Sequence, residues 1–430
     1  MHKKERVSQK LSRFWRILGP GLVTGAADDD PSGIATYSQT GAQFGTKQLW
    51  TAVMMLPFMI AVQEAAARIS VVTRSGLAEV IRNNYSRKVL YFAVLLMVFA
   101  NIFNIGADIG AMVETVNLLI SLPFFIGIVF ITAVIIFLEI FVPYRQYAKI
   151  LKLSTFALFA YPLTLVMIHV PWGYILRQTI TPHFELNFNF LFIIVGVLGT
   201  TISPYLFFWQ GNQEVEEEKE AGMVDNPHFT AKIKKMLAAM RLDNAVGMIM
   251  SEFVTWSIIV VTALVLNKNG VQNINTAAQA AAALEPLVHN FLYAGFFAKL
   301  LFAIGIIGSG LLAIPVLAGS ASYALSEAAK WEEGLSLKFW EGRHFYGAII
   351  AVMLLGMLMN FLGLNPIKAL ILAAVLNGIA APPLIYLIIK IGNNKKIMRH
   401  HTNGKMSNLF LWITFIAMSA ATLTAIVSLF

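Results

Sequence analysis

The chain has 430 residues, of which 57% are hydrophobic and only 13% are charged, and its formal net charge is +9. Soluble globular domains carry about 25% charged residues, so this composition excludes an ordinary soluble protein. Cysteine is absent from the sequence, which excludes disulfides, thiolate metal sites and cysteine nucleophiles. The basic residues lie in short segments between apolar runs, where they set membrane orientation, so we expect no nucleic-acid partner.

Apolar runs of about 20 residues, long enough to cross a hydrocarbon layer of about 30 Å, recur along the whole chain. They predict an all-α polytopic membrane protein with eleven transmembrane helices. The predicted spans are residues 15–44, 48–72, 89–120, 123–142, 150–170, 188–210, 242–267, 291–325, 345–361, 369–389 and 408–428. Three of them are longer than a crossing requires, and tilt, extension beyond the bilayer or an unwound break would absorb the extra length. The loops are too short for a soluble domain, so we expect one transmembrane domain over residues 1–430.

Lysine and arginine predict the orientation of these spans, because they accumulate in cytoplasmic loops. With the amino terminus in the cytoplasm, the outside segments hold only Lys47, Arg177, Lys268 and Lys368. The inside segments hold Lys3, Lys4, Arg6, Lys10, Arg13, Arg16, Arg74, Arg82, Arg87, Lys88, Arg145, Lys149, Lys152, Lys219, Lys232, Lys234, Lys235, Arg241, Lys330, Lys338, Arg343, Lys390, Lys395, Lys396, Arg399 and Lys405. We therefore expect a multi-pass protein of the cell inner membrane, with its carboxyl terminus outside.

The first span contains three successive aspartates, residues 28–30, directly before Pro31. An ionised carboxylate near the bilayer centre costs about 2.5 kcal/mol or more, so these three cannot face lipid. Pro31 lacks an amide hydrogen and Gly33 has little helical preference, so the helix is predicted to break here. The break would free carbonyls, such as that of Ala27, which together with a carboxylate suit a hard divalent cation.

A second interpretation is that the span begins after Pro31 and that the aspartates cap it at the membrane surface. The apolar residues from Ile17 to Ala27 argue against it, because they would then have no bilayer to occupy.

The sixth span is also interrupted, by Pro204 in its middle. Interrupted first and sixth spans, with five helices in each half, predict a 5+5 inverted repeat whose binding site lies between the two breaks. The predicted repeats are residues 15–170 and 188–389, and residues 408–428 form an extra helix.

The runs AADDDPSG, GAQFG, GADIGA, GTTISPY, LLFAIGIIGSG and LNGIAAPP resemble the Nramp family of divalent metal transporters, which share the LeuT-type fold. The resemblance covers nearly the whole chain. It implies a secondary transporter that moves a divalent metal cation across the cytoplasmic membrane by alternating access, with no cofactor apart from the transported ion. The metal ligands that it implies are Asp30, Ala27, Thr200, Ser203 and Asn377. The accessory or gating residues that it implies are Asp28, Asp29, Gly33, Pro31, Pro204 and Tyr205.

Two family motifs are altered in this chain. The Asp-Pro-Gly-Asn motif keeps Asp30 but has Gly33 where asparagine is usual, and the Ala-x-x-Met-Pro-His motif has Ser203 and Tyr205 in place of methionine and histidine. Loss of a soft thioether favours magnesium, calcium and manganese over softer metals. The smaller side chains are expected to enlarge the cavity, which suits an ion that keeps its waters. The chain is therefore similar to the Nramp-related magnesium transporters, and Mg²⁺ or Mn²⁺ is the expected ion.

The family's proton-relay residues are only partly present. Asp108 matches an acid of the third span, but a second acid one turn later is Ala111, and a second histidine of the sixth span is Gln210. We expect weak or absent proton coupling, with Asp108 as the possible proton path. The alternative is a structural Asp108 that bonds to Asn104 or Asn101.

Three other functions are alternatives to a weakly coupled carrier of a hard divalent cation. The first is an ordinary Nramp-type symporter of Mn²⁺ or Fe²⁺ with protons, and the second is an intramembrane enzyme, which lacks the HExxH and GxSxG motifs. The third is an amino-acid carrier on the same fold, which would need free amide donors for the substrate carboxylate, a group that the three aspartates would repel. Glu64, Glu139 and the acidic stretch 214–220 have no assigned role, although Arg68 or Arg145 is expected to pair with one of the first two.

Overall fold

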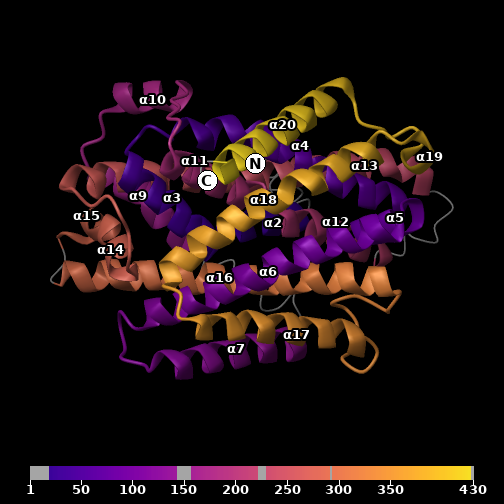
Figure 1. The fold of residues 1–430 in the computed structure, drawn as a ribbon, viewed down its shortest axis with the longest axis horizontal. Helices are drawn as coiled ribbons and strands as arrows, with labels where there is room; N and C mark the ends of the chain where they lie inside the picture. Colours follow the sequence, from indigo (N-terminus) through magenta and orange to yellow (C-terminus); the bar gives the residue numbers. More distant parts are fainter. Residues whose placement is uncertain (1–18, 143–155, 221–228, 291–292, 428–430) are drawn as a thin grey trace, which may run out of the picture.

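The computed structural model describes residues 19–142, 156–220, 229–290 and 293–427, and these form a bundle of helices in which no strand occurs (Figure 1). In chain order the α-helices are α2 (Pro20–Asp28), α3 (Pro31–Phe44), α4 (Trp50–Thr73), α5 (Leu77–Asn84), α6 (Arg87–Val116), α7 (Phe124–Phe141), α9 (Ala160–Met167), α10 (Trp172–Ile180), α11 (Phe188–Thr201), α12 (Pro204–Glu220), α13 (Phe229–Val265), α14 (Ala277–Ala281), α15 (Glu285–Val288), α16 (Ala294–Ala329), α17 (Arg343–Met359), α18 (Pro366–Gly392), α19 (Lys395–Met398) and α20 (Lys405–Val427). The 3-10 helices are η1 (Phe156–Phe159), η2 (Asn267–Asn269), η3 (Ala282–Leu284) and η4 (Asn360–Leu362).

The long helices run along the long axis of the molecule, and the short helices gather at its two ends (Figure 1). α5 and α19 lie at one end, whereas α10, α14 and α15 lie at the other. α7 and α17 pack together at one edge of the bundle, and α20 packs on α18 at the opposite edge. α5 and α19 belong to loops that the basic residues assign to the cytoplasm, whereas α10, α14 and α15 belong to loops assigned to the outside. The helices of each group therefore lie together, as the predicted orientation requires.

Within the described ranges, nine helical segments are long and apolar enough to cross a membrane. They correspond to the second, third, fourth and sixth to eleventh predicted spans. The two other predicted spans are the first, which is divided into α2 and α3, and residues 150–170, of which the described part forms η1 and α9. Each of the eleven predicted spans thus corresponds to helical structure in the described residues.

The three over-long spans absorb their length in different ways. The first of them is interrupted between α2 and α3. The other two are continuous helices: α6 has 30 residues, and α16 has 36 residues with Pro315 inside it. At 1.5 Å per residue α16 is about 54 Å long, so it extends beyond the hydrocarbon layer. α13 also extends beyond its predicted start near residue 242, because it begins at Phe229.

Glycines allow two helix pairs to touch through their backbones. α13 packs along α2 and α3, and α18 packs along α11. A Cβ atom at Gly25 on α2 would lie 2.3 Å from the carbonyl oxygen of Gly247 on α13, and one at Gly199 on α11 would lie 2.1 Å from that of Ala374 on α18. Small residues at such contacts are typical of membrane helix packing, where close approach supplies the attraction. One helix of each predicted repeat, α2 in the first and α11 in the second, is therefore anchored through a glycine contact.

The half-helix α2 is capped by a side chain from another helix. Its N-cap residue is Gly19, which has no side chain to accept a hydrogen bond. Instead, the Asp243 carboxylate of α13 accepts bonds from the backbone N–H of Gly19 at 3.0 Å, of Leu22 at 3.0 Å and of Gly21 at 2.6 Å. A negative charge at this position also favours the helix dipole. The broken first span is thus held in place by α13.

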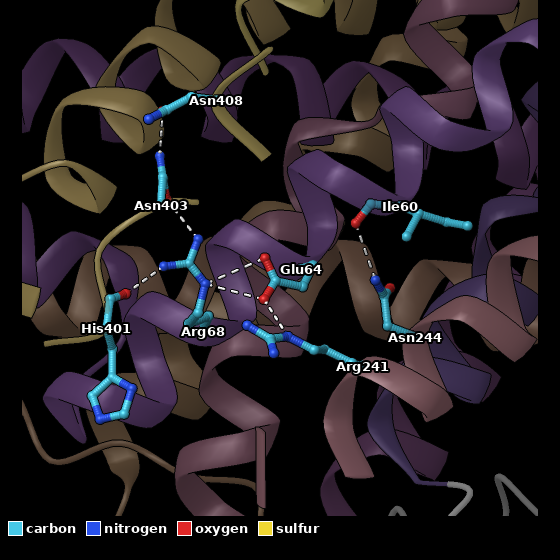
Figure 2. Close-up of polar contacts among 8 residues, drawn as sticks. All are labelled: Ile60, Glu64, Arg68, Arg241, Asn244, His401, Asn403 and Asn408. Carbon is cyan, nitrogen blue, oxygen red and sulfur yellow. Dashed lines mark hydrogen bonds and ion pairs between the residues drawn. The ribbon is translucent and has the colours of Figure 1, made fainter. Parts of the chain in front are cut away.

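Arg68 on α4 joins three parts of the chain (Figure 2). Its side chain is only 3% exposed, and its Nε lies 3.0 Å from Oε1 of Glu64. Its Nη1 donates to the backbone oxygen of His401 at 2.6 Å, and its Nη2 donates to the side chain of Asn403. Arg241 on α13 donates to the same Glu64 oxygen at 2.8 Å. The prediction that Arg68 pairs with an interior acid is confirmed for Glu64, and the role of this acid is structural.

The second interior acid is not explained in the same way. Both carboxylate oxygens of Glu139 on α7 are buried and have no hydrogen-bond partner among the described residues. Arg145, the other partner considered, lies outside those residues.

The glycine contact between α2 and α13 gives a first test. Alanine normally stabilises a helix by up to about 1 kcal/mol relative to glycine, but in Gly247→Ala the new Cβ would lie 2.2 Å from the backbone oxygen of Gly21. We expect Gly247→Ala to lower the free energy of unfolding by about 1–3 kcal/mol, as overpacking does. Gly347→Ala on α17 is the matched control, because nothing lies within 4 Å of its Cβ position. Stability is measured by thermal unfolding in detergent. If both variants were equally stable, the close packing of α2 on α13 would be contradicted.

Candidate metal site

The first span is broken at the aspartates. α2 ends at Asp28, Asp29 has φ −82° and ψ 50°, and Asp30 has φ −69° and ψ 170° as the N-cap of α3. The predicted break is therefore confirmed. The capping interpretation is half right: Asp30 does cap α3 by accepting from the N–H of Gly33 at 2.7 Å. It is wrong that the helix starts there, because α2 precedes the cap inside the bundle.

The sixth span is broken in the same way. α11 ends at Thr201 and α12 begins at Pro204, so the predicted interruption at this proline is confirmed. The Ser203 hydroxyl donates back to the oxygens of Gly199 at 2.8 Å and Thr200 at 2.7 Å. The Tyr205 hydroxyl donates to the carbonyl oxygen of Ala27 at 2.8 Å. This last bond joins the two breaks, and it occupies one lone pair of a carbonyl that the sequence identified as a candidate ligand.

Asp30 lies at the first break, next to α6, and it is only 1% exposed. Its Oδ1 accepts from the Ser32 hydroxyl at 2.7 Å and from the N–H of Gly33 at 2.7 Å. Its Oδ2 accepts from the Asn104 side-chain amide at 2.8 Å. All three donors are neutral, so they orient the carboxylate without cancelling its charge. Sequence reasoning did not connect Asn104 with Asp30.

Several buried polar atoms near the breaks have no hydrogen-bond partner among the described residues. They are Oγ1 of Thr200, both side-chain atoms of the Asn377 amide and both oxygens of Asp108. The Thr200 hydroxyl lies 3.0 Å from the Cβ position of Gly33, and Asn377 is on α18, which packs against α3, α6 and α11. A buried polar group without a partner costs about 1–3 kcal/mol. A bound cation or water would remove this cost.

The hydrogen bonds expected for a structural Asp108 are not found, because the amide groups of its two expected partners donate elsewhere. Asn104 donates to Asp30, and Asn101 donates to the backbone oxygen of Leu317 and the hydroxyl of Ser320, each at 2.8 Å. Asp108 is therefore a buried acid that its neighbouring asparagines do not satisfy.

The expected enlargement of the cavity is not found at Gly33. A Cβ atom there would lie 3.0 Å from Oγ1 of Thr200, 3.2 Å from the backbone oxygen of Asp28 and 3.2 Å from Cε2 of Tyr37. These neighbours already fill the space that a larger side chain would take. The absence of asparagine therefore removes an amide ligand without opening room beside it.

The three successive aspartates separate onto two sides of the bundle. Asp30 faces α6, but Asp28 and Asp29 face α13, where the Ser251 hydroxyl lies 2.8 Å from Oδ2 of Asp28 and 3.3 Å from Oδ1 of Asp29. Both oxygens of the adjacent buried Glu252 lack a hydrogen-bond partner in the part of the chain that is described. Sequence reasoning missed Ser251 and Glu252, although a serine and a glutamate inside an apolar span were a signal.

The described residues contain no group of three histidine, cysteine, aspartate or glutamate side chains that could hold a bare metal ion. A cation between the breaks would instead meet one carboxylate, from Asp30, with amide, hydroxyl and carbonyl oxygens and water. This is the ligand chemistry of hard divalent ions.

Comparisons with known proteins agree with this geometry. A family model described as natural resistance-associated macrophage protein-like (Nramp) matches residues 21–428. A protein of Caldanaerobacter subterraneus subsp. tengcongensis named divalent metal cation transporter MntH is 25% identical over 411 residues, which cover 93% of this chain and 90% of that protein. A protein of the same name from Klebsiella pneumoniae subsp. pneumoniae is 25% identical over 410 residues, with 93% and 92% of the two chains covered.

Solved structures share the fold. The crystal structure of the Eremococcus coleocola manganese transporter, in complex with an aromatic bis-isothiourea substituted compound, matches with a TM-score of 0.76 at 17% identity and covers 96% of this chain and 87% of that one. Mhp1, a nucleobase-cation-symport-1 family transporter, matches with a TM-score of 0.60 at 15% identity, covering 96% and 90%. The predicted LeuT-type architecture with broken first and sixth helices is confirmed.

The family match covers nearly the whole chain, and the fold and the two broken helices agree with it. This chain therefore belongs to the Nramp family, and it is a multi-pass membrane transporter and not an enzyme.

Proposed function

We propose that this protein carries a hard divalent metal cation, Mg²⁺ or Mn²⁺, across the cytoplasmic membrane, with Asp30 as the central ligand. The observation that carries the proposal is a buried carboxylate held by neutral donors at a helix break. Polar atoms of Thr200 and Asn377, on helices of the same bundle, lack hydrogen-bond partners among the described residues. Relatives over more than nine-tenths of this chain are named divalent metal cation transporters.

The proposed ligands are Asp30, the Ala27 carbonyl, Thr200, Ser203 and the Asn377 amide, all of which offer oxygen. Magnesium dehydrates reluctantly and usually keeps several waters, so few direct protein ligands suffice. The Tyr205 hydroxyl is proposed to act as a gate, because its hydrogen bond joins the two helix breaks and occupies one of the two lone pairs of the Ala27 carbonyl.

Alternating access is proposed to occur around this site. The proposed repeats are residues 15–170 and 188–389, and Pro31 and Pro204 begin the second half of each broken helix. Because broken helices leave backbone groups free near the bilayer centre, a rocking motion can expose the same ion first to one side and then to the other.

The proposed orientation follows from the basic residues. Among the described residues, the end of the bundle that carries α5 and α19 also carries most of the loop lysines and arginines, so it is proposed to face the cytoplasm. The opposite end, with α10, α14 and α15, then faces outside.

Proton coupling is proposed to be weak. Among the residues that align with the family's relay, only Asp108 is an acid, and Gln210 accepts a hydrogen bond from Gln63 at 2.8 Å as an ordinary structural amide. The alternative is a proton-coupled symporter of the ordinary Nramp type. It has one observation in its favour, namely that both oxygens of Asp108 are buried and accept no side-chain hydrogen bond from the described residues.

The first test is Asp30→Asn. The asparagine oxygen can still accept from Gly33 and cap α3, so we expect a folded protein with nearly unchanged thermal stability. Loss of the only charge among the proposed ligands should abolish Mg²⁺ and Mn²⁺ uptake into proteoliposomes. Asp29→Asn, which faces α13, is the matched comparison and should lose less. Uptake at the parental rate by a folded Asp30→Asn variant would rule out this site.

The second test concerns ligand hardness. Ser203→Met introduces a thioether beside the break, and we expect it to raise the ratio of Cd²⁺ to Mg²⁺ affinity by about tenfold, or about 1.4 kcal/mol. Ser203→Ala is the control, because it removes the hydroxyl without adding sulfur. Isothermal titration with both ions measures the ratio. If Ser203→Met and Ser203→Ala bind Cd²⁺ equally, hardness does not determine selectivity here.

The third test is the internal pH of proteoliposomes during metal uptake. Weak coupling predicts brisk Mg²⁺ or Mn²⁺ entry with a flat pH trace, driven by the ion gradient and the membrane potential. Acidification that follows metal entry and disappears in Asp108→Asn would instead establish the proton-coupled alternative.

A further inference from the structure

The end of the bundle that carries α5 and α19 has an acidic side and a basic side. On the side of α12 and α16 the basic residues lie among carboxylates, and a cavity of about 700 Å³ at the end of α16 is lined by six glutamates together with Arg82, Lys219 and Lys330. On the side of α18, α19 and α20 no acid accompanies them, because the sequence contains no aspartate or glutamate after Glu341. Positive charge on this second side is therefore not balanced within its own segment.

The basic side is the connection between α18 and α20. Residues 390–405 contain five lysines and arginines, all of them exposed, and two histidines. We call the five exposed residues the basic patch: they are Lys390, Lys395, Lys396, Arg399 and Lys405. Within the described part of the chain, none of the five forms an ion pair with a carboxylate. Their charges are therefore available to a partner outside the protein.

The potential around the patch is positive, and a neighbouring histidine reports it. Burial, and then the charges of His400, Arg68 and Lys234, lower the pKa of His401. A nearby positive charge disfavours a protonated imidazole, so the shift has the sign that an excess of positive charge produces. Lys234 comes from α13, which shows that basic residues of a second segment reach the same place.

The connection that carries the patch is tied down at several points. Arg68 of α4 donates to the backbone oxygen of His401 and to the side chain of Asn403, as Figure 2 shows. The side chains of Asn393 and Asn408 exchange two hydrogen bonds of 2.8 Å and so close the connection on itself. The patch is therefore presented by an ordered platform.

The backbone of this platform is strained at one residue of the patch. Arg399 has φ 52° and ψ −115°, a conformation that a residue with a side chain rarely adopts. Such a conformation costs free energy and persists only where the surrounding structure imposes it. The course of the backbone through the patch is thus fixed by its neighbours.

Aromatic side chains lie directly beside the patch, on the two spans that it joins. Tyr386 of α18 is 40% exposed and Trp412 of α20 is 39% exposed, and their ring centres lie 6.3 Å apart. Nζ of Lys390 lies 6.0 Å from the centre of the Tyr386 ring. Tyrosine and tryptophan are enriched where a membrane meets water. Lys390 and Lys405, at the adjoining helix ends, are therefore at the level of lipid headgroups.

We propose that the basic patch binds the headgroups of anionic phospholipids in the leaflet that it faces. Lysine and arginine donate charge-assisted hydrogen bonds to phosphate oxygens, and a cluster of them next to a membrane span attracts anionic lipids. Zwitterionic lipids fit less well, because their own cationic group offsets the phosphate. The rings of Tyr386 and Trp412 pack on the lipid below its headgroup. The proposed orientation makes this the cytoplasmic leaflet, and the site does not depend on which ion the protein carries.

The test measures which lipid lies next to the patch. The sequence contains no cysteine, so Met406→Cys, at a side chain that is 64% exposed, gives one site for a fluorophore beside Lys405. The labelled full-length protein is placed in phosphatidylcholine nanodiscs with a small fraction of nitroxide-labelled phosphatidylglycerol or nitroxide-labelled phosphatidylcholine. We expect the phosphatidylglycerol to quench about twofold more than the phosphatidylcholine, and we expect NaCl to reduce this preference by screening.

The variant that removes the patch is Lys395→Gln, Lys396→Gln, Lys405→Gln in the labelled protein. These side chains are exposed and form no ion pair among the described residues, so the variant should fold, and thermal unfolding in detergent checks this. We expect it to quench equally with both lipids. Lys405→Gln alone should lose part of the preference, and it replaces the triple variant if that protein unfolds.

A matched control removes three exposed lysines from the acidic side of the same end, by Lys219→Gln, Lys330→Gln, Lys338→Gln. It changes the net charge equally and should keep the preference for phosphatidylglycerol. The proposal is overturned if the parent shows no preference, or if the control loses it to the same extent as the patch variant. It is also overturned if inorganic phosphate abolishes the preference where NaCl of equal ionic strength does not, because the occupant would then be a free phosphate ion.

Discussion

The structure depends on a helix that is interrupted inside the bilayer at a row of carboxylates. A charged side chain and free backbone groups are both costly in hydrocarbon, so each must find partners within the bundle. Asp30 meets both needs at once, because its carboxylate caps α3 through Gly33 and is held by Asn104 from α6. The interruption is stable only because neighbouring helices supply these partners.

The other half of the broken helix relies on α13. The three backbone N–H groups at the start of α2 have the Asp243 carboxylate as their acceptor, and the contact between Gly25 and Gly247 brings the two backbones together. A half-helix of nine residues is too short to be stable on its own. Its position is therefore a property of the α2 and α13 pair.

The separation of the aspartates has a functional consequence. A break lets successive side chains leave the helix in different directions, so Asp30 faces α6 while Asp28 and Asp29 face Ser251 of α13. The proposed transport site then contains one of the three carboxylates rather than all of them. Under the proposed function, a single carboxylate with neutral oxygen ligands would attract a divalent ion and leave the complex with a net positive charge, which favours release.

The sequence by itself determined the spans, the two breaks and the row of aspartates at the first break, because these depend on local chemistry. Apolar length marks a membrane helix, and a proline that follows three aspartates cannot lie in an unbroken one. The aspartates stood out because a charged residue in an apolar run needs a reason, whereas Thr200 and Asn377 came from the resemblance to the Nramp family.

Only the tertiary structure decided which side chains meet. Asp243 lies more than 200 positions from the helix that it caps, and Asn104 bonds to Asp30 rather than to Asp108. The space beside Gly33 is also smaller than the sequence predicts, because Thr200 and Tyr37, which fill it, come from another span and another turn. The acidic cavity at the end of α16 joins residues of four segments in the same way. Hydrogen bonds and cavities between helices depend on distances in space, and spacing along the chain carries no record of them.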